Sequence, residues 1–109
     1  MRTIYIALLV GVLTACASTG GTLEYKPEHW IGANWVITGK AEVGGDADTV
    51  FIKINDKDVI SGQLSRQMPE EEFTGDFEGY DISAKCKLVD SSHNCSVLVD
   101  NKMAGQLSF

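Results

Sequence analysis

Apolar and polar residues alternate with a period of two from residue 34 to residue 109, and this pattern constrains the fold more than any other feature. In the first run, Trp35, Ile37 and Val43 share one face, while Thr38 and Lys40 lie on the other. Side chains alternate in this way along a β-strand, whereas an amphipathic helix repeats every 3.6 residues. Since nothing after residue 16 has the helical period, the sequence predicts an all-β fold.

The alternating runs define about seven strands, which short turns connect. The inward positions fall within residues 35–43, 50–54, 60–64, 73–77, 80–88, 95–99 and 103–109. Turn-forming residues separate several of these runs, as in GGDAD (44–48), NDKD (55–58), DSSHN (90–94) and DNK (100–102). Because short turns join neighbouring antiparallel strands, we expect an antiparallel meander.

One strand pairing follows from parity. Inward positions are odd up to Phe77 and even from Tyr80, so a two-residue turn at Glu78 and Gly79 is the simplest connection. The same reasoning places Cys86 opposite Cys95. It also pairs Gly75 with Ile82, Phe73 with Ala84 and Leu88 with His93.

Inward glycines recur in the middle of four strands, between apolar residues, at Gly39, Gly62, Gly75 and Gly105. A glycine there permits sharp bending of a strand or close approach of another backbone. The alternative is that glycine simply tolerates a crowded core. We expect a small curled sheet or barrel.

Residues 1–15 have the form of a secretory signal peptide. Arg2 supplies a positive charge, and a mostly aliphatic run from Ile4 to Leu13 follows it. A bilayer span needs about 20 apolar residues, so this run is too short to cross a membrane.

The sequence Leu13-Thr14-Ala15-Cys16 resembles the lipobox of bacterial lipoproteins. The resemblance implies cleavage before Cys16, a diacylglycerol on its thiol and an acylated amino group. The alternative is an ordinary secretory signal, with Cys16 free or in a disulfide. Several acyl chains hold a protein stably on a membrane. In that family an Asp after the cysteine commonly signals inner-membrane retention. Ala17 therefore favours the outer membrane, with the domain facing the periplasm or the cell exterior.

The mature chain would begin with a lipidated flexible tether over residues 16–29, followed by one all-β domain over residues 30–109. Residues 17–29 lack sustained periodicity and contain Ser, Thr, Gly and Pro. Without Arg2 the chain has 8 basic and 15 acidic residues. This net negative charge disfavours nucleic acid as a partner and favours a basic one; the alternative is that the acidity only keeps the small domain in solution.

Lipidation would leave two cysteines, Cys86 and Cys95. An even pair in an exported chain predicts a disulfide, and the spacing matches neither a CXXC redox site nor a paired CXXC zinc site. The Cα atoms of directly opposite residues on antiparallel strands lie about 4.5 to 5.5 Å apart, a distance that a disulfide can bridge.

The second half also resembles small exported all-β proteins that are uncharacterised. They share a Gly-rich hairpin, a Cys-containing strand and a CxVxV-type strand, and they end in a Gly-x-Leu-x-Phe-like sequence. The residues that match are Cys86, Cys95, Val97, Val99, Gly105, Leu107 and Phe109. The resemblance implies no activity.

The strongest candidates for a partner-binding surface are an acidic stretch and a tryptophan. They are Glu70, Glu71, Glu72, Asp76, Glu78, Asp81 and Trp30. The alternative for the carboxylates is a solvated sheet edge that resists edge-to-edge pairing. Trp30 lies near the junction of tether and domain and could contact lipid or protein.

No catalytic, cofactor or metal site is predicted. Asp46-Ala47-Asp48 lacks most of the ligands of a calcium loop, and the histidines, His29 and His93, are too few for a zinc site. The serines have no evident His/Asp setting. We therefore expect a monomeric, non-enzymatic protein-binding module of inhibitor, immunity or exclusion type. The alternatives are a structural or accessory subunit of an envelope assembly and a small-ligand carrier.

Overall fold

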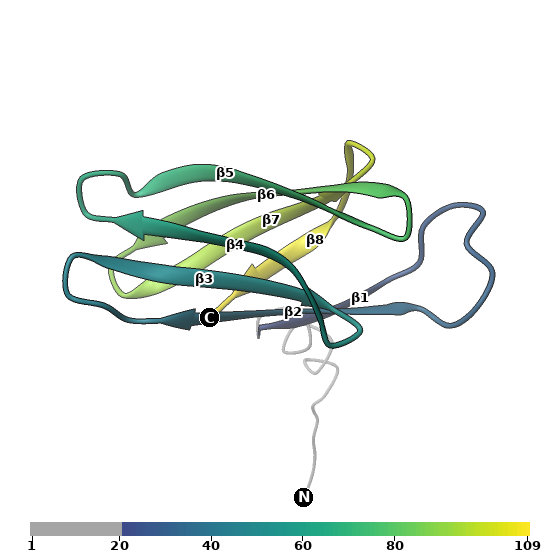
Figure 1. Cartoon of the computed structure of the whole chain (residues 1–109), viewed down its shortest axis with the longest axis horizontal. Helices are drawn as coiled ribbons and strands as arrows, with labels where there is room; N and C mark the ends of the chain where they lie inside the picture. The colour runs from purple at the N-terminus through teal and green to yellow at the C-terminus, as the bar shows by residue number, and fades with distance from the viewer. Residues whose placement is uncertain (1–20) are drawn as a thin grey trace, which may run out of the picture.

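The computed structural model describes residues 21–109, which form eight antiparallel strands in two four-stranded sheets (Figure 1). The first sheet has β1 (Thr22–Tyr25), β2 (Trp35–Glu42), β3 (Ala47–Ile54) and β4 (Lys57–Ser65). The second has β5 (Glu70–Phe77), β6 (Tyr80–Val89), β7 (Ser92–Val99) and β8 (Lys102–Ser108). The all-β prediction is confirmed, and residues 21–109 contain no helix.

The predicted pairing of the 73–88 region is confirmed residue by residue. Phe77 lies opposite Tyr80, and the turn residues Glu78 and Gly79 both have positive φ, at 51° and 84°. Two positive φ values are the signature of a type I′ hairpin turn, whose twist matches that of the strands. The other pairs found as predicted are Gly75 with Ile82, Phe73 with Ala84, Cys86 with Cys95 and Leu88 with His93.

The seven-strand expectation missed β1. Thr22–Tyr25 pairs antiparallel with Trp35–Thr38, although these four residues fall inside the range assigned to the tether. Leu23 and Tyr25 do alternate with polar neighbours, but four residues are too few for a periodic signal. The remainder of the predicted tether before Gly21, the signal peptide and Cys16 lie outside the described residues.

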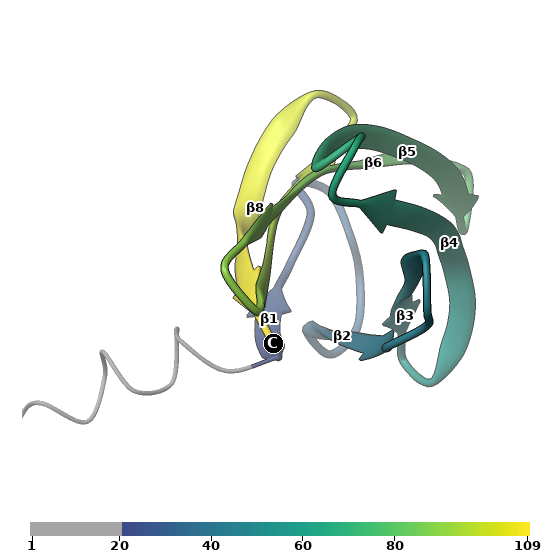
Figure 2. The ribbon, with the colours of Figure 1, turned by 90° about the vertical axis from the view of Figure 1, so that its left-hand side faces the viewer.

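The sheets face one another instead of forming one continuous curled sheet or closed barrel, so that part of the prediction is not confirmed (Figure 2). The chain crosses between the sheets at residues 66–69, where the connection is not a tight hairpin. β5 then packs against β4 without joining its hydrogen-bonded ladder.

The core lies between the two sheets, and its apolar residues were all predicted to face inward. The prediction was wrong for Val43, which lies beyond the end of β2, and for Met103, which follows a register shift in the β7–β8 pairing; they are 81% and 58% exposed. Trp35, on β2, is fully buried and has four edge-to-face aromatic neighbours. Edge-to-face contacts add about 0.5 to 1.5 kcal/mol per pair beyond the area that they bury. The other buried apolar residues are Ile37, Val50, Ile52, Ile54, Ile60, Leu64, Phe77, Ile82, Ala84, Cys86, Cys95, Val97, Val99 and Leu107.

Two of the inward glycines make room for aromatic rings from the opposite sheet. A Cβ at Gly62 on β4 would overlap the ring of Phe73 on β5, and one at Gly39 on β2 would overlap the ring of Phe109. These glycines therefore permit close packing at the two margins where the sheets meet.

Candidate functional site

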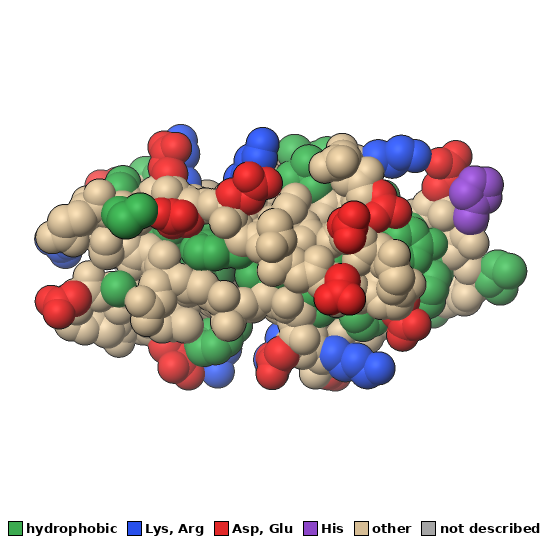
Figure 3. Space-filling model, turned by 45° about the horizontal axis from the view of Figure 1, so that its top comes forward, with side chains coloured by type: hydrophobic (Ala, Val, Ile, Leu, Met, Phe, Trp, Pro, Cys, Tyr) green, Lys and Arg blue, Asp and Glu red, His purple; other side chains and the backbone are tan. Residues whose placement is uncertain are grey.

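The acidic residues predicted to bind a partner lie together on the β5–β6 hairpin. Glu70, Glu72 and Asp76 alternate along the outward face of β5, and Asp81 lies on the outward face of β6. Glu71 has the opposite parity and is half-buried, while Glu78 occupies the turn. Figure 3 shows acidic side chains spread over this part of the molecule, with lysines or arginines beside some of them.

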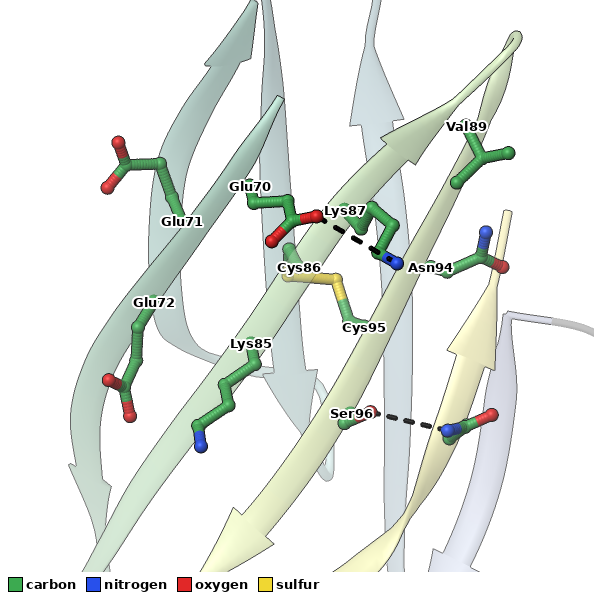
Figure 4. A pocket seen from close by; sticks show the side chains of 11 residues that line it. Glu70, Glu71, Glu72, Lys85, Cys86, Lys87, Val89, Asn94, Cys95 and Ser96 are labelled. Atoms are coloured by element: carbon green, nitrogen blue, oxygen red, sulfur yellow. Dashed lines mark hydrogen bonds and ion pairs between the residues drawn. A yellow bond between two sulfur atoms is a disulfide. The ribbon is translucent and has the colours of Figure 1, made fainter. Parts of the chain in front are cut away.

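At the β6–β7 turn end of the hairpin, lysines of β6 accompany the carboxylates. Glu70 forms an ion pair with Lys87 at 3.9 Å, and Glu72 lies opposite Lys85 in the strand register (Figure 4). A shallow hollow of about 580 Å³ separates these side chains from Ser96 and its neighbours on β7. Because the two lysines lie beside the glutamates, this region is nearly charge-balanced. Exposed ion pairs contribute only about 0 to 1 kcal/mol, so the pair adds little to stability.

At the other end of the hairpin, two carboxylates face each other with no partner of opposite charge. Asp76 and Asp81 are directly opposite on the outward face, and neither forms an ion pair with any residue in the range 21–109. Like charges in this position destabilise a sheet, by an amount comparable to the 0.2 to 1 kcal/mol of other cross-strand pairs.

These two carboxylates line a hollow of about 540 Å³, which we call the acidic hollow. The backbone N–H of Asp81 donates to Oδ1 of Asp100 at 2.8 Å, which brings the β7–β8 turn against the hairpin. The residues that line it are Glu72, Thr74, Gly75, Asp76, Asp81, Ile82, Ser83 and Asn101. The hollow thus combines three carboxylates with hydroxyl and amide groups, a suitable lining for a cationic group.

Trp30 lies in the 26–34 connection between β1 and β2, and it is half-buried. Its ring packs edge-to-face on Trp35 and Tyr80 at centroid distances of 5.4 and 6.2 Å, and Nε1 donates to the carbonyl of Ala33. This packing fastens the connection to the core. The neighbouring Ile31 is 94% exposed, so it is the better placed of the two for contact with another molecule.

An ion pair holds the same connection to the β7–β8 turn. Nζ of Lys102 donates to Oε1 of Glu28 at 2.8 Å. This hydrogen bond, together with the attraction between the two opposite charges, lowers the pKa of Glu28 and raises that of Lys102. Since both groups are exposed, the pair orients the loop more than it stabilises the fold.

The predicted disulfide is confirmed. Cys86 and Cys95 are bonded at 2.07 Å, both are buried, and they join the directly opposite positions of β6 and β7.

The sequence analysis missed a buried contact between Asp48 and His93, which lie 45 residues apart. Nε2 of His93 is 2.8 Å from Oδ2 of Asp48 and links the two sheets. This hydrogen bond lowers the pKa of Asp48, and burial opposes the shift. Parity had placed His93 inward opposite Leu88, but nothing in the sequence identified Asp48 as its partner.

Within residues 21–109, no three His, Cys, Asp or Glu side chains come close enough together to hold a metal ion. The same part of the chain contains no helix of the length and apolarity that crossing a membrane would require. Comparison of the chain with protein-family models, curated proteins and solved structures finds no match in any of the three.

Proposed function

We propose that this chain is a lipid-anchored envelope protein whose domain binds a basic protein partner through the acidic hollow. It would act as an inhibitor, an immunity protein or an exclusion factor. The lipobox-like sequence supports the anchor at Cys16, and Ala17 favours the outer membrane. The observation that carries the binding proposal is that Asp76 and Asp81 lie directly opposite each other, and neither forms an ion pair within residues 21–109.

A cationic side chain from a partner would relieve the repulsion between these two carboxylates. Charge-assisted hydrogen bonds to carboxylates are roughly twice as strong as neutral ones, and arginine can bind them through two nitrogens. Glu70 already has Lys87 as its partner, so the charge of that region is less available. The hollow is therefore the part of the acidic stretch that an added positive charge would stabilise most.

An apolar contact is available at the same end of the domain. Tyr80, next to Asp81 in the chain, packs against Trp30, so the 26–34 connection lies beside this end of the hairpin. Full burial of an isoleucine such as Ile31 contributes about 1.5 to 3 kcal/mol. A basic partner with an apolar patch could use both features.

The carrier alternative finds less support in the packing of the core. The rings of Phe73 and Phe109 occupy the space that Gly62 and Gly39 leave. A ligand between the sheets would have to displace them.

The experiment is crosslinked capture from intact envelopes with the native lipidated protein, Asp76→Asn/Asp81→Asn and a matched control. Glu70→Gln/Glu71→Gln is the control, because it removes the same charge from the same hairpin outside the acidic hollow. We expect one basic protein to be captured by the native and control forms and reduced at least about tenfold by the first variant, equivalent to 1.4 kcal/mol.

Equal capture by the two variants, or no capture by any form, would exclude the hollow as the binding site. The anchor is tested separately by the mass of the mature N-terminus and by Cys16→Ser. That variant should lose acylation and leave the membrane fraction without changing binding in detergent.

A further inference from the structure

One corner of the domain joins the two sheets through the side chain of His93. Asp48 lies near the start of β3 in the first sheet, His93 lies on β7 in the second, and Phe109 follows β8. The His93 side chain is 4% exposed and that of Asp48 is 17% exposed. The imidazole stacks on the ring of Phe109, with centroids 5.7 Å apart and planes at 13°.

Both nitrogens of this imidazole face hydrogen-bond acceptors. Nε2 is 2.8 Å from Oδ2 of Asp48, and Nδ1 is 3.1 Å from the main-chain oxygen of Phe109, which also accepts the backbone N–H of His93 at 2.8 Å. The main-chain oxygen of Phe109 cannot donate, whether as a peptide carbonyl or as a carboxylate of the last residue of the sequence, and neither can an ionised Asp48. A neutral imidazole carries only one N–H. With a neutral ring and an ionised Asp48, one of the two contacts would set a nitrogen lone pair against an oxygen.

Both contacts become hydrogen bonds when the pair holds one more proton. In that arrangement both ring nitrogens carry a hydrogen, and the ionised carboxylate of Asp48, whose pKa the hydrogen bond lowers, accepts from Nε2. Because the ring is buried, a contact that lost its proton would leave polar atoms unpaired away from water.

Three other charged groups lie at this corner. Arg66 acts on Asp48 through its charge, and Arg66, Asp46 and Asp90 line a groove of about 640 Å³ together with Asp48.

We infer that Asp48, His93 and Phe109 form a proton-dependent clasp between the two sheets. The folded protein retains a proton in the Asp48–His93 pair, and loss of that proton as the pH rises loosens the corner. The effect extends to the groove, because Oδ1 of Asp48 accepts a hydrogen bond from the backbone N–H of Gly44 at 3.2 Å. The 43–46 loop, which lines the groove, is thus held by the same carboxylate.

The first test is urea unfolding of the purified protein between about pH 5.5 and 9. A proton that the folded state holds and the unfolded chain releases makes stability fall as the pH rises. We expect the folding equilibrium constant of the native protein to fall by up to about tenfold per pH unit over part of this range.

Asp48→Asn is the informative variant. Its amide can donate to Nε2 while the N–H at Nδ1 donates to Phe109, so a neutral ring satisfies both contacts. The fall in stability with pH should disappear or reverse. His29→Asn is the control, because His29 is exposed in the 26–34 connection and its replacement should leave the pH dependence unchanged.

Native-state hydrogen exchange at Gly44 provides a second measurement that needs no variant. Its amide should lose protection at the alkaline pH where stability falls. A native protein whose stability is flat or rises over this range would overturn the inference. Unchanged pH dependence in Asp48→Asn, or protection of Gly44 that is independent of pH, would do the same.

Discussion

Replacement of Gly62 by alanine tests whether the inward glycines exist to admit aromatic rings. A Cβ at this position would overlap the ring of Phe73, which reaches Gly62 across the margin between β4 and β5. Overpacking of this kind costs typically about 1 to 3 kcal/mol. Removing a glycine from a strand returns about 0.5 to 1 kcal/mol, because alanine loses less backbone entropy on folding.

The net expectation is a loss of about 1 kcal/mol in the free energy of unfolding. For a domain of this size, that loss lowers Tm by about 4 to 8 °C. The assay is thermal and urea unfolding followed by circular dichroism. Gly45→Ala is the matched control, since a Cβ at Gly45 would meet nothing within 4 Å. That variant should be as stable as the native protein or slightly more stable.

A double-mutant cycle with Phe73→Leu identifies the ring as the cause. Gly62→Ala should cost less in the Phe73→Leu background than alone, because the shorter side chain does not extend over the glycine. Residues in contact commonly show interaction energies of about 0.5 to 3 kcal/mol. If Gly62→Ala is neutral or stabilising, or costs the same in both backgrounds, the ring does not require the glycine.

Three further predictions concern single groups. Hydrogen bonding lowers the pKa of Asp48, so its ionised carboxylate stabilises the fold above the unfolded pKa near 3.8, and this stabilisation is lost as the pH falls through the folded pKa. In acid unfolding, Asp48→Asn should lack this loss of stability. Glu78→Asn should raise the free energy of unfolding by about 0.5 to 1 kcal/mol in urea titrations, since asparagine tolerates a φ of 51° better than glutamate does; an unchanged midpoint would show that the turn carries no strain. Reduction of Cys86–Cys95 should lower stability by about 2.7 kcal/mol for the ten-residue loop, and a midpoint that is the same with and without reductant would contradict the loop-entropy estimate.

The local pattern was sufficient to predict β2 to β8 and the pairing across residues 73–95. Strand period, turn composition and parity are all encoded within a few residues of one another. The turn at Glu78 and Gly79 then determines which side chains on β5 and β6 lie opposite each other. The Cys86–Cys95 disulfide followed from the same parity, because the two cysteines share one hairpin.

The candidate site was predictable only as a set of charges. The sequence placed Glu70 and Asp76 in the same stretch, but it did not identify which of them would be balanced. In the fold, Lys87 pairs with Glu70, while Asp76 has Asp81 opposite it. Strand register therefore determines where the unpaired charge lies.

By itself the sequence determined the fold class, most of the strands and the inward face of most of them, since these depend on neighbours along the chain. Tertiary structure decided how the two sheets pack, why Gly39 and Gly62 are glycines, and that β1 forms at all. It also brought Asp48 to His93 across 45 residues. Such contacts depend on how the two sheets pack against each other, which no local periodicity specifies.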